Sequence, residues 1–176
     1  MQALILGGAR SGKSRHAEQL ARQSGREVIY IATAEAQDGE MQARIAHHRA
    51  SRPAHWRTVE EPLALAAALQ QHAAANRLLL VDCLTLWLAN LLGVDAGQCL
   101  HTETQALLTT LPSLPGDVLL VSNETGLGVV PLGELTRRYV DAAGRLHQQL
   151  AAQLDAVVFM VAGLPLTLKG TPTWNG

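Results

Sequence analysis

Short apolar runs alternate with segments of helical periodicity along the chain, and this alternation predicts the fold. The apolar runs are typical of buried strands and cover residues 2–6, 27–32, 77–82, 117–122 and 155–161. Helical patterns separate or follow them, at residues 13–24, 39–50, 62–75, 84–92, 101–111 and 132–153. Strand, helix and strand within ~30 residues form a βαβ unit, which requires a parallel sheet. We therefore predict an α/β protein with five or six core strands in a mainly parallel sheet and helices on both faces.

The C-terminal part of the chain predicts an edge strand and the limits of the domain. Residues 164–168 are predicted to add an edge strand, because Pro165 cannot donate a hydrogen bond inside a sheet. Neither an internal repeat nor a low-complexity linker interrupts the chain, so we expect one domain over residues 1–170 and a frayed tail over residues 171–176.

Composition and charge exclude several classes of protein. Hydrophobic residues make up 48% of the chain and charged residues 16%, which favours a packed core over disorder. A net charge of −1 and 3% aromatic residues argue against a nucleic-acid partner. The longest uncharged apolar run, residues 83–94, is too short for the ~20 residues of a transmembrane helix. Cys83 and Cys99 fit neither a disulfide framework nor a zinc site, and no signal peptide is recognisable, so we expect a cytoplasmic protein.

A phosphate-binding motif directly follows the first predicted strand. Gly7-Gly8-Ala9-Arg10-Ser11-Gly12-Lys13-Ser14 fits the P-loop pattern G-x-x-x-x-G-K-[ST] and opens the first helix. Glycines let the backbone turn its N–H groups around phosphate oxygens, and the helix N-terminus adds partial positive charge. In this arrangement Lys13 reaches the β- and γ-phosphates and neutralises developing charge, while Ser14 offers a hydroxyl to Mg²⁺. The alternative is a purely structural glycine turn.

An acid follows the apolar run at residues 77–81. P-loop proteins place such an acid near Mg²⁺, so Asp82 is a candidate metal ligand together with Ser14. The alternative is an N-cap for the helix that begins at Leu84, and the two roles are compatible. The neighbouring Cys83 is expected to be a small buried apolar residue.

A histidine pair lies on the polar helix predicted before Pro53. Glu40, Arg44 and His47 share one face of that helix. His47 and His48 are either solvated surface residues or, as neutral imidazole close to a phosphate, a candidate nucleophile. A metal site is disfavoured because adjacent histidines diverge by ~100° on a helix.

The segment Ser122–Pro131 follows the fourth apolar run and therefore lies at the binding edge of an open α/β sheet. It is either part of a site or an ordinary loop. Arg137, Arg138 and Arg145 could reach phosphates, although a solvated helix face explains each of them.

Together these blocks resemble the bifunctional adenosylcobinamide kinase / adenosylcobinamide-phosphate guanylyltransferase family of cobalamin biosynthesis. The resemblance runs from residue 2 to about residue 168 and is far more specific than a P-loop alone. The matching blocks are Gly7 to Glu18, Tyr30-Ile31-Ala32-Thr33, Glu40-Met41 through Arg44-Ile45 to His47-His48, Arg52-Pro53-Ala54-His55-Trp56-Arg57-Thr58, Asp82-Cys83-Leu84-Thr85, and Ser122-Asn123-Glu124 through Gly126-Leu127-Gly128 to Pro131.

The resemblance implies a RecA-like P-loop fold, a homotrimer, and two reactions. ATP or GTP would phosphorylate adenosylcobinamide with Mg²⁺, and GMP from GTP would then pass through a covalent intermediate on His47 to adenosylcobinamide phosphate. No permanently bound cofactor is implied. The implied nucleotide contacts are Gly7 to Ser14, Thr33, Ala34, Glu35, His48, Arg49, Ala50, Ser51, Glu60 and Asp82.

The residues alone also allow two other functions. One is a P-loop small-molecule kinase in which His47 is a surface residue, and the other is a non-catalytic nucleotide-binding switch. The chain contains no Asn-Lys-x-Asp segment of the kind that reads guanine, which argues against the switch.

Overall fold

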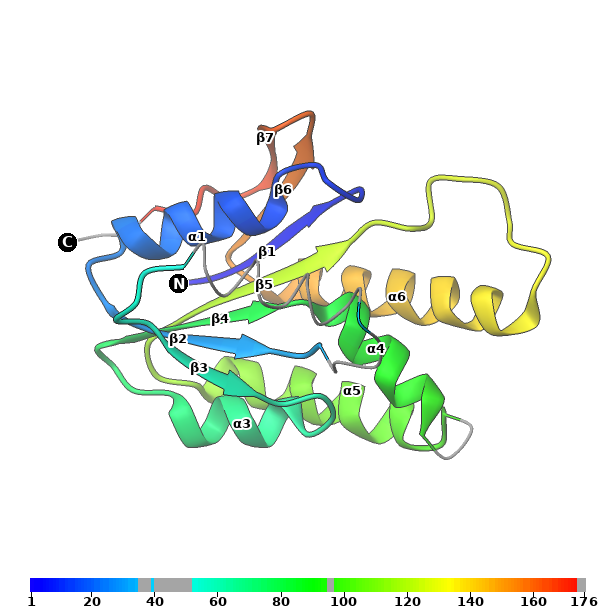
Figure 1. Ribbon diagram of the computed structural model, residues 1–176, viewed down its shortest axis with the longest axis horizontal. Coiled ribbons are helices and arrows are strands. Elements are labelled where there is room, and N and C mark those ends of the chain that lie inside the picture. Colours follow the sequence, from blue (N-terminus) through cyan, green and yellow to red (C-terminus); the bar gives the residue numbers. More distant parts are fainter. Residues whose placement is uncertain (35–38, 40–51, 95–96, 174–176) are drawn as a thin grey trace.

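A seven-stranded sheet forms the centre of the molecule (Figure 1). The computed structural model describes residues 1–34, 39, 52–94 and 97–173. The strands lie in the order β3-β2-β4-β5-β1-β6-β7, and every neighbouring pair is parallel except β6 and β7. Their bounds are β1 Gln2–Gly7, β2 Glu27–Ala32, β3 Arg57–Glu60, β4 Arg77–Asp82, β5 Asp117–Asn123, β6 Ala156–Val161 and β7 Leu164–Lys169.

Helices cover both faces of the sheet, as predicted. Of the helices in the described residues, α1 lies on one face, and α3, α4, α5 and α6 lie on the other (Figure 1). The helices are α1 Lys13–Gln23, α3 Leu65–His72, α4 Leu84–Gly93, α5 Cys99–Thr110 and α6 Glu134–Gln153, with a 3₁₀ turn, η2, at Leu111–Ser113.

Alternate residues of each strand enter two separate hydrophobic clusters. In β1, Leu4 and Leu6 pack on the face of α3 to α6, whereas Ala3 and Ile5 pack on the face of α1. This follows from the period of two along a strand. Because both faces are buried, the strands read as continuous apolar runs, and this is why the sequence pattern located them.

One strand was not predicted, and several element bounds differ from the prediction. The strand β3 was not expected, because Arg57-Thr58-Val59-Glu60 is short and has charged ends, and its place depends on parallel pairing with the edge of β2. The helix α3 covers Leu65–His72 rather than residues 62–75, and α5 already begins at Cys99. The predicted edge strand at residues 164–168 is confirmed as β7, the antiparallel end of the sheet. The predicted helix at residues 39–50 lies outside the described residues except for Gly39.

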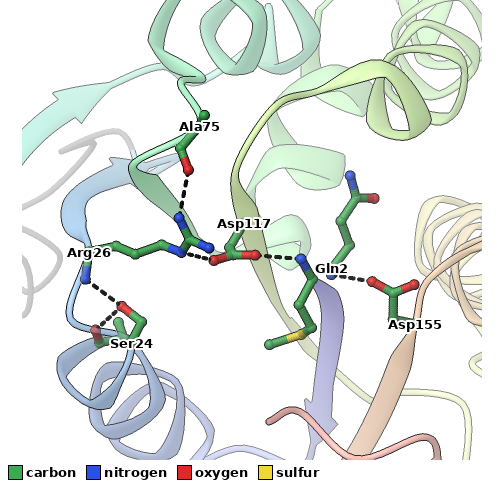
Figure 2. Close-up of polar contacts among 8 residues, drawn as sticks. Gln2, Ser24, Arg26, Ala75, Asp117 and Asp155 are labelled. Carbon is green, nitrogen blue, oxygen red and sulfur yellow. Dashed lines mark hydrogen bonds and ion pairs between the residues drawn. The ribbon is translucent and has the colours of Figure 1, made fainter. Parts of the chain in front are cut away.

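Polar contacts tie together the amino ends of the strands (Figure 2). Asp117 at the start of β5 is 3% exposed, and its carboxylate pairs with both the Met1 amino group and the Arg26 guanidinium. Arg26 Nη1 also donates to Ala75 O at 2.6 Å, and Gln2 N donates to Asp155 Oδ2 at 2.7 Å. Two cations thus compensate a buried charge at this edge.

None of the helices in the described ranges is long and apolar enough to cross a membrane.

Candidate functional site

A cavity of about 590 Å³ lies at the carboxyl ends of the parallel strands. In an open α/β sheet this edge is where ligands bind. The cavity is bounded by the loop between β1 and α1, by the ends of β2, β3, β4 and β5, and by the start of α4. Its lining residues are Ala9, Arg10, Ser11, Gly12, Lys13, Ser14, Arg15, Tyr30, Ala32, Ala34, Arg52, Thr58, Glu60, Asp82, Cys83, Thr85, Leu86 and Asn123.

Backbone conformation and close packing both shape the phosphate loop. Gly7 has φ +151°, and a Cβ there would lie 2.6 Å from Met160 O and 2.6 Å from Ser11 Oγ. Gly12 has φ +98° and stands at the N-cap of α1, where no side chain of the described residues caps the helix. The first N–H groups of α1 therefore remain available to an anion. The turn between β6 and β7 supports the loop, since Gly163 N donates to Ser11 O at 3.0 Å.

Lys13 lies against its own loop. Its side chain is buried, and Nζ donates to Gly8 O at 2.7 Å. Burial lowers the pKa of Lys13, an effect that the nearby Asp82 carboxylate opposes. The ammonium is thus held at the loop, where it can contact a bound phosphate chain.

Asp82 faces the cavity from the end of β4. Its Oδ2 accepts a hydrogen bond of 2.9 Å from the Tyr30 hydroxyl. The N-cap position of α4 belongs to Cys83 and has no side-chain cap, so the capping role considered for Asp82 is wrong. Cys83 was expected to be buried, but it is only partly buried and lines the cavity. The burial of its thiol is still enough to raise the pKa to about 11.

The oxygen donors here fit Mg²⁺ in its usual mode. No group of three or more His, Cys, Asp or Glu side chains in the described ranges could hold a metal ion. Mg²⁺ commonly uses one or two protein oxygens and completes its shell with water and substrate phosphates. The Ser14 hydroxyl and the Asp82 carboxylate, both in the cavity lining, are hard oxygen donors of that kind.

The structure gathers about half of the predicted site residues in the cavity lining. Those gathered are Ala9, Arg10, Ser11, Gly12, Lys13, Ser14, Ala34, Glu60 and Asp82. Three lie outside the lining, namely Gly7, Gly8 and Thr33. Six more lie outside the described residues, namely Glu35, His47, His48, Arg49, Ala50 and Ser51.

The side chain of Thr33 is hydrogen-bonded to Cys83 and does not line the cavity. Its side chain is fully buried. The hydroxyl donates to Cys83 O at 2.7 Å and accepts from Cys83 N at 2.9 Å. Thr33 therefore joins the ends of β2 and β4, and its hydroxyl is already occupied on both sides.

Several cavity residues were not among the predicted nucleotide, catalytic or metal contacts. Tyr30 and Arg52 meet in the cavity although they lie far apart in the sequence, and no spacing rule indicates such a pair. Thr85 and Asn123 come from different elements and are joined by a hydrogen bond of 2.7 Å from Asn123 N to Thr85 Oγ1. Asn123 belongs to the candidate segment Ser122–Pro131, whereas Thr85 had no signal beyond its place in one of the blocks that resemble the family.

A buried polar cluster supports the end of β5. His147 Nε2 on α6 lies 2.8 Å from Ser122 Oγ, and His147 Nδ1 lies 3.8 Å from Glu124 Oε2. Glu124 N donates to Gly7 O at 3.0 Å, which links this end of β5 to the phosphate loop. Of the candidate segment Ser122–Pro131, the structure places Asn123 in the cavity lining. The candidate phosphate ligands Arg137, Arg138 and Arg145 are exposed on α6, outside that lining.

Known proteins match this chain over nearly its whole length. The family model "Cobinamide kinase / cobinamide phosphate guanyltransferase" matches residues 3–168. The bifunctional adenosylcobalamin biosynthesis protein CobP of Pseudomonas aeruginosa is 68% identical over 172 residues, covering 98% of this chain and 99% of that protein. The bifunctional adenosylcobalamin biosynthesis protein CobU of Escherichia coli is 42% identical over 182 residues, covering 96% of this chain and 100% of that protein.

Among solved structures, the RadB recombinase is similar in fold. It matches with a TM-score of 0.52 and 16% identity, over 90% of this chain and 73% of that chain. At this identity the likeness concerns the fold alone. Together with the order of the parallel strands, it confirms the expected RecA-like P-loop fold.

Proposed function

Since the chain belongs to the cobinamide kinase / cobinamide phosphate guanyltransferase family, we propose that it catalyses two successive transfers. It phosphorylates adenosylcobinamide with a nucleoside triphosphate, and it then transfers GMP from GTP to adenosylcobinamide phosphate, giving adenosylcobinamide-GDP. The observation that carries this proposal is the cavity that Lys13, Ser14 and Asp82 line together at the N-terminus of α1, which has no side-chain cap. This constellation suits a triphosphate.

In the kinase step, the hydroxyl oxygen of the aminopropanol arm of adenosylcobinamide attacks the γ-phosphorus. The bond to the β,γ-bridging oxygen breaks, and the hydroxyl proton passes to solvent. Lys13 and the N–H groups of the loop stabilise the charge that develops on the phosphate oxygens. Ser14 and Asp82 would hold Mg²⁺, which supplies further neutralisation of that charge. Precise positioning of the two reactants provides much of the rate.

In the guanylyl step, neutral His47 attacks the α-phosphorus of GTP and expels pyrophosphate. A phosphate oxygen of adenosylcobinamide phosphate then takes GMP from the histidine. The covalent intermediate divides one difficult transfer between anionic reactants into two easier steps. His47 lies outside the described residues, so this role rests on the resemblance to the family.

The remaining expectations belong to the same proposal. Nucleotide contacts are assigned to the loop from Gly7 to Ser14, to residues 33–35, to residues 48–51, to Glu60 and to Asp82. We further infer one catalytic domain over residues 1–170 with a tail at 171–176, a homotrimeric assembly, and a cytoplasmic location.

The guanylyl step is tested by incubation with Mg²⁺ and GTP labelled at the α-phosphate, without corrinoid, followed by denaturing electrophoresis. We expect an acid-labile, alkali-stable label on the protein that is lost in His47→Asn. His101→Asn is the matched control, because His101 is exposed on α5 and should label normally. Labelling should fall as the pH drops below the imidazole pKa of ~6.5, since a protonated imidazole cannot attack. A label retained in His47→Asn, or a flat profile from pH 8 to pH 5, contradicts the covalent step.

The kinase step is tested separately with γ-labelled ATP or GTP and adenosylcobinamide. The label should appear in the corrinoid, and comparison of the two nucleotides identifies the preferred donor. Label transfer to the corrinoid without labelling of the protein would leave a monofunctional kinase.

A further inference from the structure

One arginine in the cavity has no role in the steps described above. Arg52 stacks on Tyr30, with its guanidinium carbon 3.3 Å from the centroid of the ring. Tyr30 belongs to β2 and is 2% exposed, and its hydroxyl donates to Asp82 on β4 at 2.9 Å. The ring is thus fixed both by packing and by a hydrogen bond, so it is a rigid support for the guanidinium.

Arg52 and the phosphate loop line the cavity from different sides. The loop follows β1, whereas Tyr30 and Asp82 lie on β2 and β4, which β5 separates from β1 in the sheet. The side chains of Tyr30 and Asp82 point to the face of the sheet that carries α1, since Tyr30 packs in the cluster of α1 and the residues of β4 alternate between faces. A ligand held by the loop on this face would therefore extend toward Arg52.

The guanidinium retains unused hydrogen-bonding capacity. Its Nε is buried and has no hydrogen-bond partner among the described residues. Stacking on a ring satisfies the flat face of a guanidinium but leaves its N–H groups, which lie in the plane, free for an acceptor. The planar fork of N–H donors matches the oxygens of a phosphate group.

We propose that Arg52 is a second phosphate-binding residue, which contacts phosphate oxygens in the cavity from the side opposite to the phosphate loop, with Tyr30 as its positioning residue. This inference rests on the proposed function. The phosphate comes either from the nucleotide triphosphate or from the phosphate monoester of adenosylcobinamide phosphate. In both cases the cation reduces the repulsion between two anionic reactants in one cavity.

Titration calorimetry with GTP and, separately, with adenosylcobinamide phosphate tests the assignment and needs no turnover. We expect Arg52→Gln to lower the affinity for one of the two ligands about tenfold to a hundredfold, which is the range for loss of a hydrogen bond to a charged group. The ligand that is weakened identifies the source of the phosphate. Arg52→Lys should recover only part of the affinity, because an ammonium keeps the charge but lacks the fork.

Arg145→Gln is the matched control, since it makes the same change of charge on the exposed face of α6, outside the cavity lining. A thermal melt of each variant checks the fold. If Arg52→Gln binds both ligands as tightly as Arg145→Gln does, the assignment is refuted. If the wild-type protein transfers neither label in the assays above, the proposed function fails, and the titrations still decide whether Arg52 binds phosphate.

The positioning role of Tyr30 has its own readout. Tyr30→Leu should lower the affinity for the same ligand in the wild-type background. In the Arg52→Gln background it should cause no further loss of affinity. Tyr30→Phe keeps the stacked ring and should restore most of the affinity. Equal losses from Tyr30→Leu with and without Arg52 would show that the ring does not act through the guanidinium.

Discussion

Replacement of His147 by alanine tests the packing that holds the end of β5 next to the phosphate loop. His147 and Ser122 are 7% and 1% exposed, and their side chains lie 2.8 Å apart. The following residue, Asn123, lines the cavity, and Glu124 N is bonded to the loop at Gly7 O. The variant therefore removes a buried hydrogen bond directly behind the candidate site.

Two terms give the size of the effect. The buried Ser122 hydroxyl, left with only its long contact of 3.5 Å to Thr85 Oγ1, costs ~1–3 kcal/mol. The lost contacts of the imidazole ring and the cavity left behind add roughly 1 kcal/mol. The sum is a loss of about 2–4 kcal/mol in the free energy of unfolding, which lowers the Tm of a chain of this size by about 5–15 °C.

The assay is urea unfolding of wild type, His147→Ala, Ser122→Ala and the double variant, followed by circular dichroism. The losses of the two single variants should sum to more than the loss of the double variant. The difference, which is the coupling energy, should be about 1 kcal/mol. His101→Ala on the exposed face of α5 is the control. A loss in His147→Ala no larger than that of the control, or strict additivity of the two substitutions, would refute the reasoning.

Three further predictions concern His147, Gly7 and Lys13. Burial lowers the pKa of His147 more strongly than Glu124 raises it, so the unfolded chain binds a proton at higher pH than the folded one. The free energy of unfolding should therefore fall as the pH drops below ~6.5. His147→Gln should reduce the pH dependence of the denaturant midpoint but not abolish it, because burial also lowers the pKa of His16 and His72. The same pH dependence in wild type and variant would contradict this prediction. Gly7→Ala brings a Cβ to 2.6 Å from Met160 O at a φ of +151°, and should cost about 2–4 kcal/mol and weaken GTP binding. The control is Gly144→Ala within α6, where nothing lies within 4 Å of the new Cβ, and it should stabilise the protein by ~0.5–1 kcal/mol. Similar Tm values for the two variants would contradict the packing argument. Lys13→Gln should keep the fold and slow phosphoryl transfer to the corrinoid ~10²–10³-fold, as measured with labelled nucleotide; a loss below about tenfold would exclude a role for the ammonium in the transition state.

The strands that are buried on both faces, and the loop that follows the first of them, could be predicted from the amino-acid sequence. Burial on both faces demands continuous apolar runs, so the strands containing Ile29, Leu79 and Val118 could be located without any knowledge of their neighbours. The phosphate loop is equally local, because its glycines and Lys13 act within one turn of backbone.

Which distant residues meet at the carboxyl edge of the sheet depends on how the strands are arranged in three dimensions. The strand β3 exists because its backbone pairs with the edge of β2, and its side chains carry no period that reports this. The fully buried hydroxyl of Thr33, the stack of Arg52 on Tyr30 and the bond between His147 and Ser122 each join segments that are at least 20 residues apart. The physical reason is that a period along the chain records which face a residue buries, whereas the order and register of the strands select its partner across the sheet.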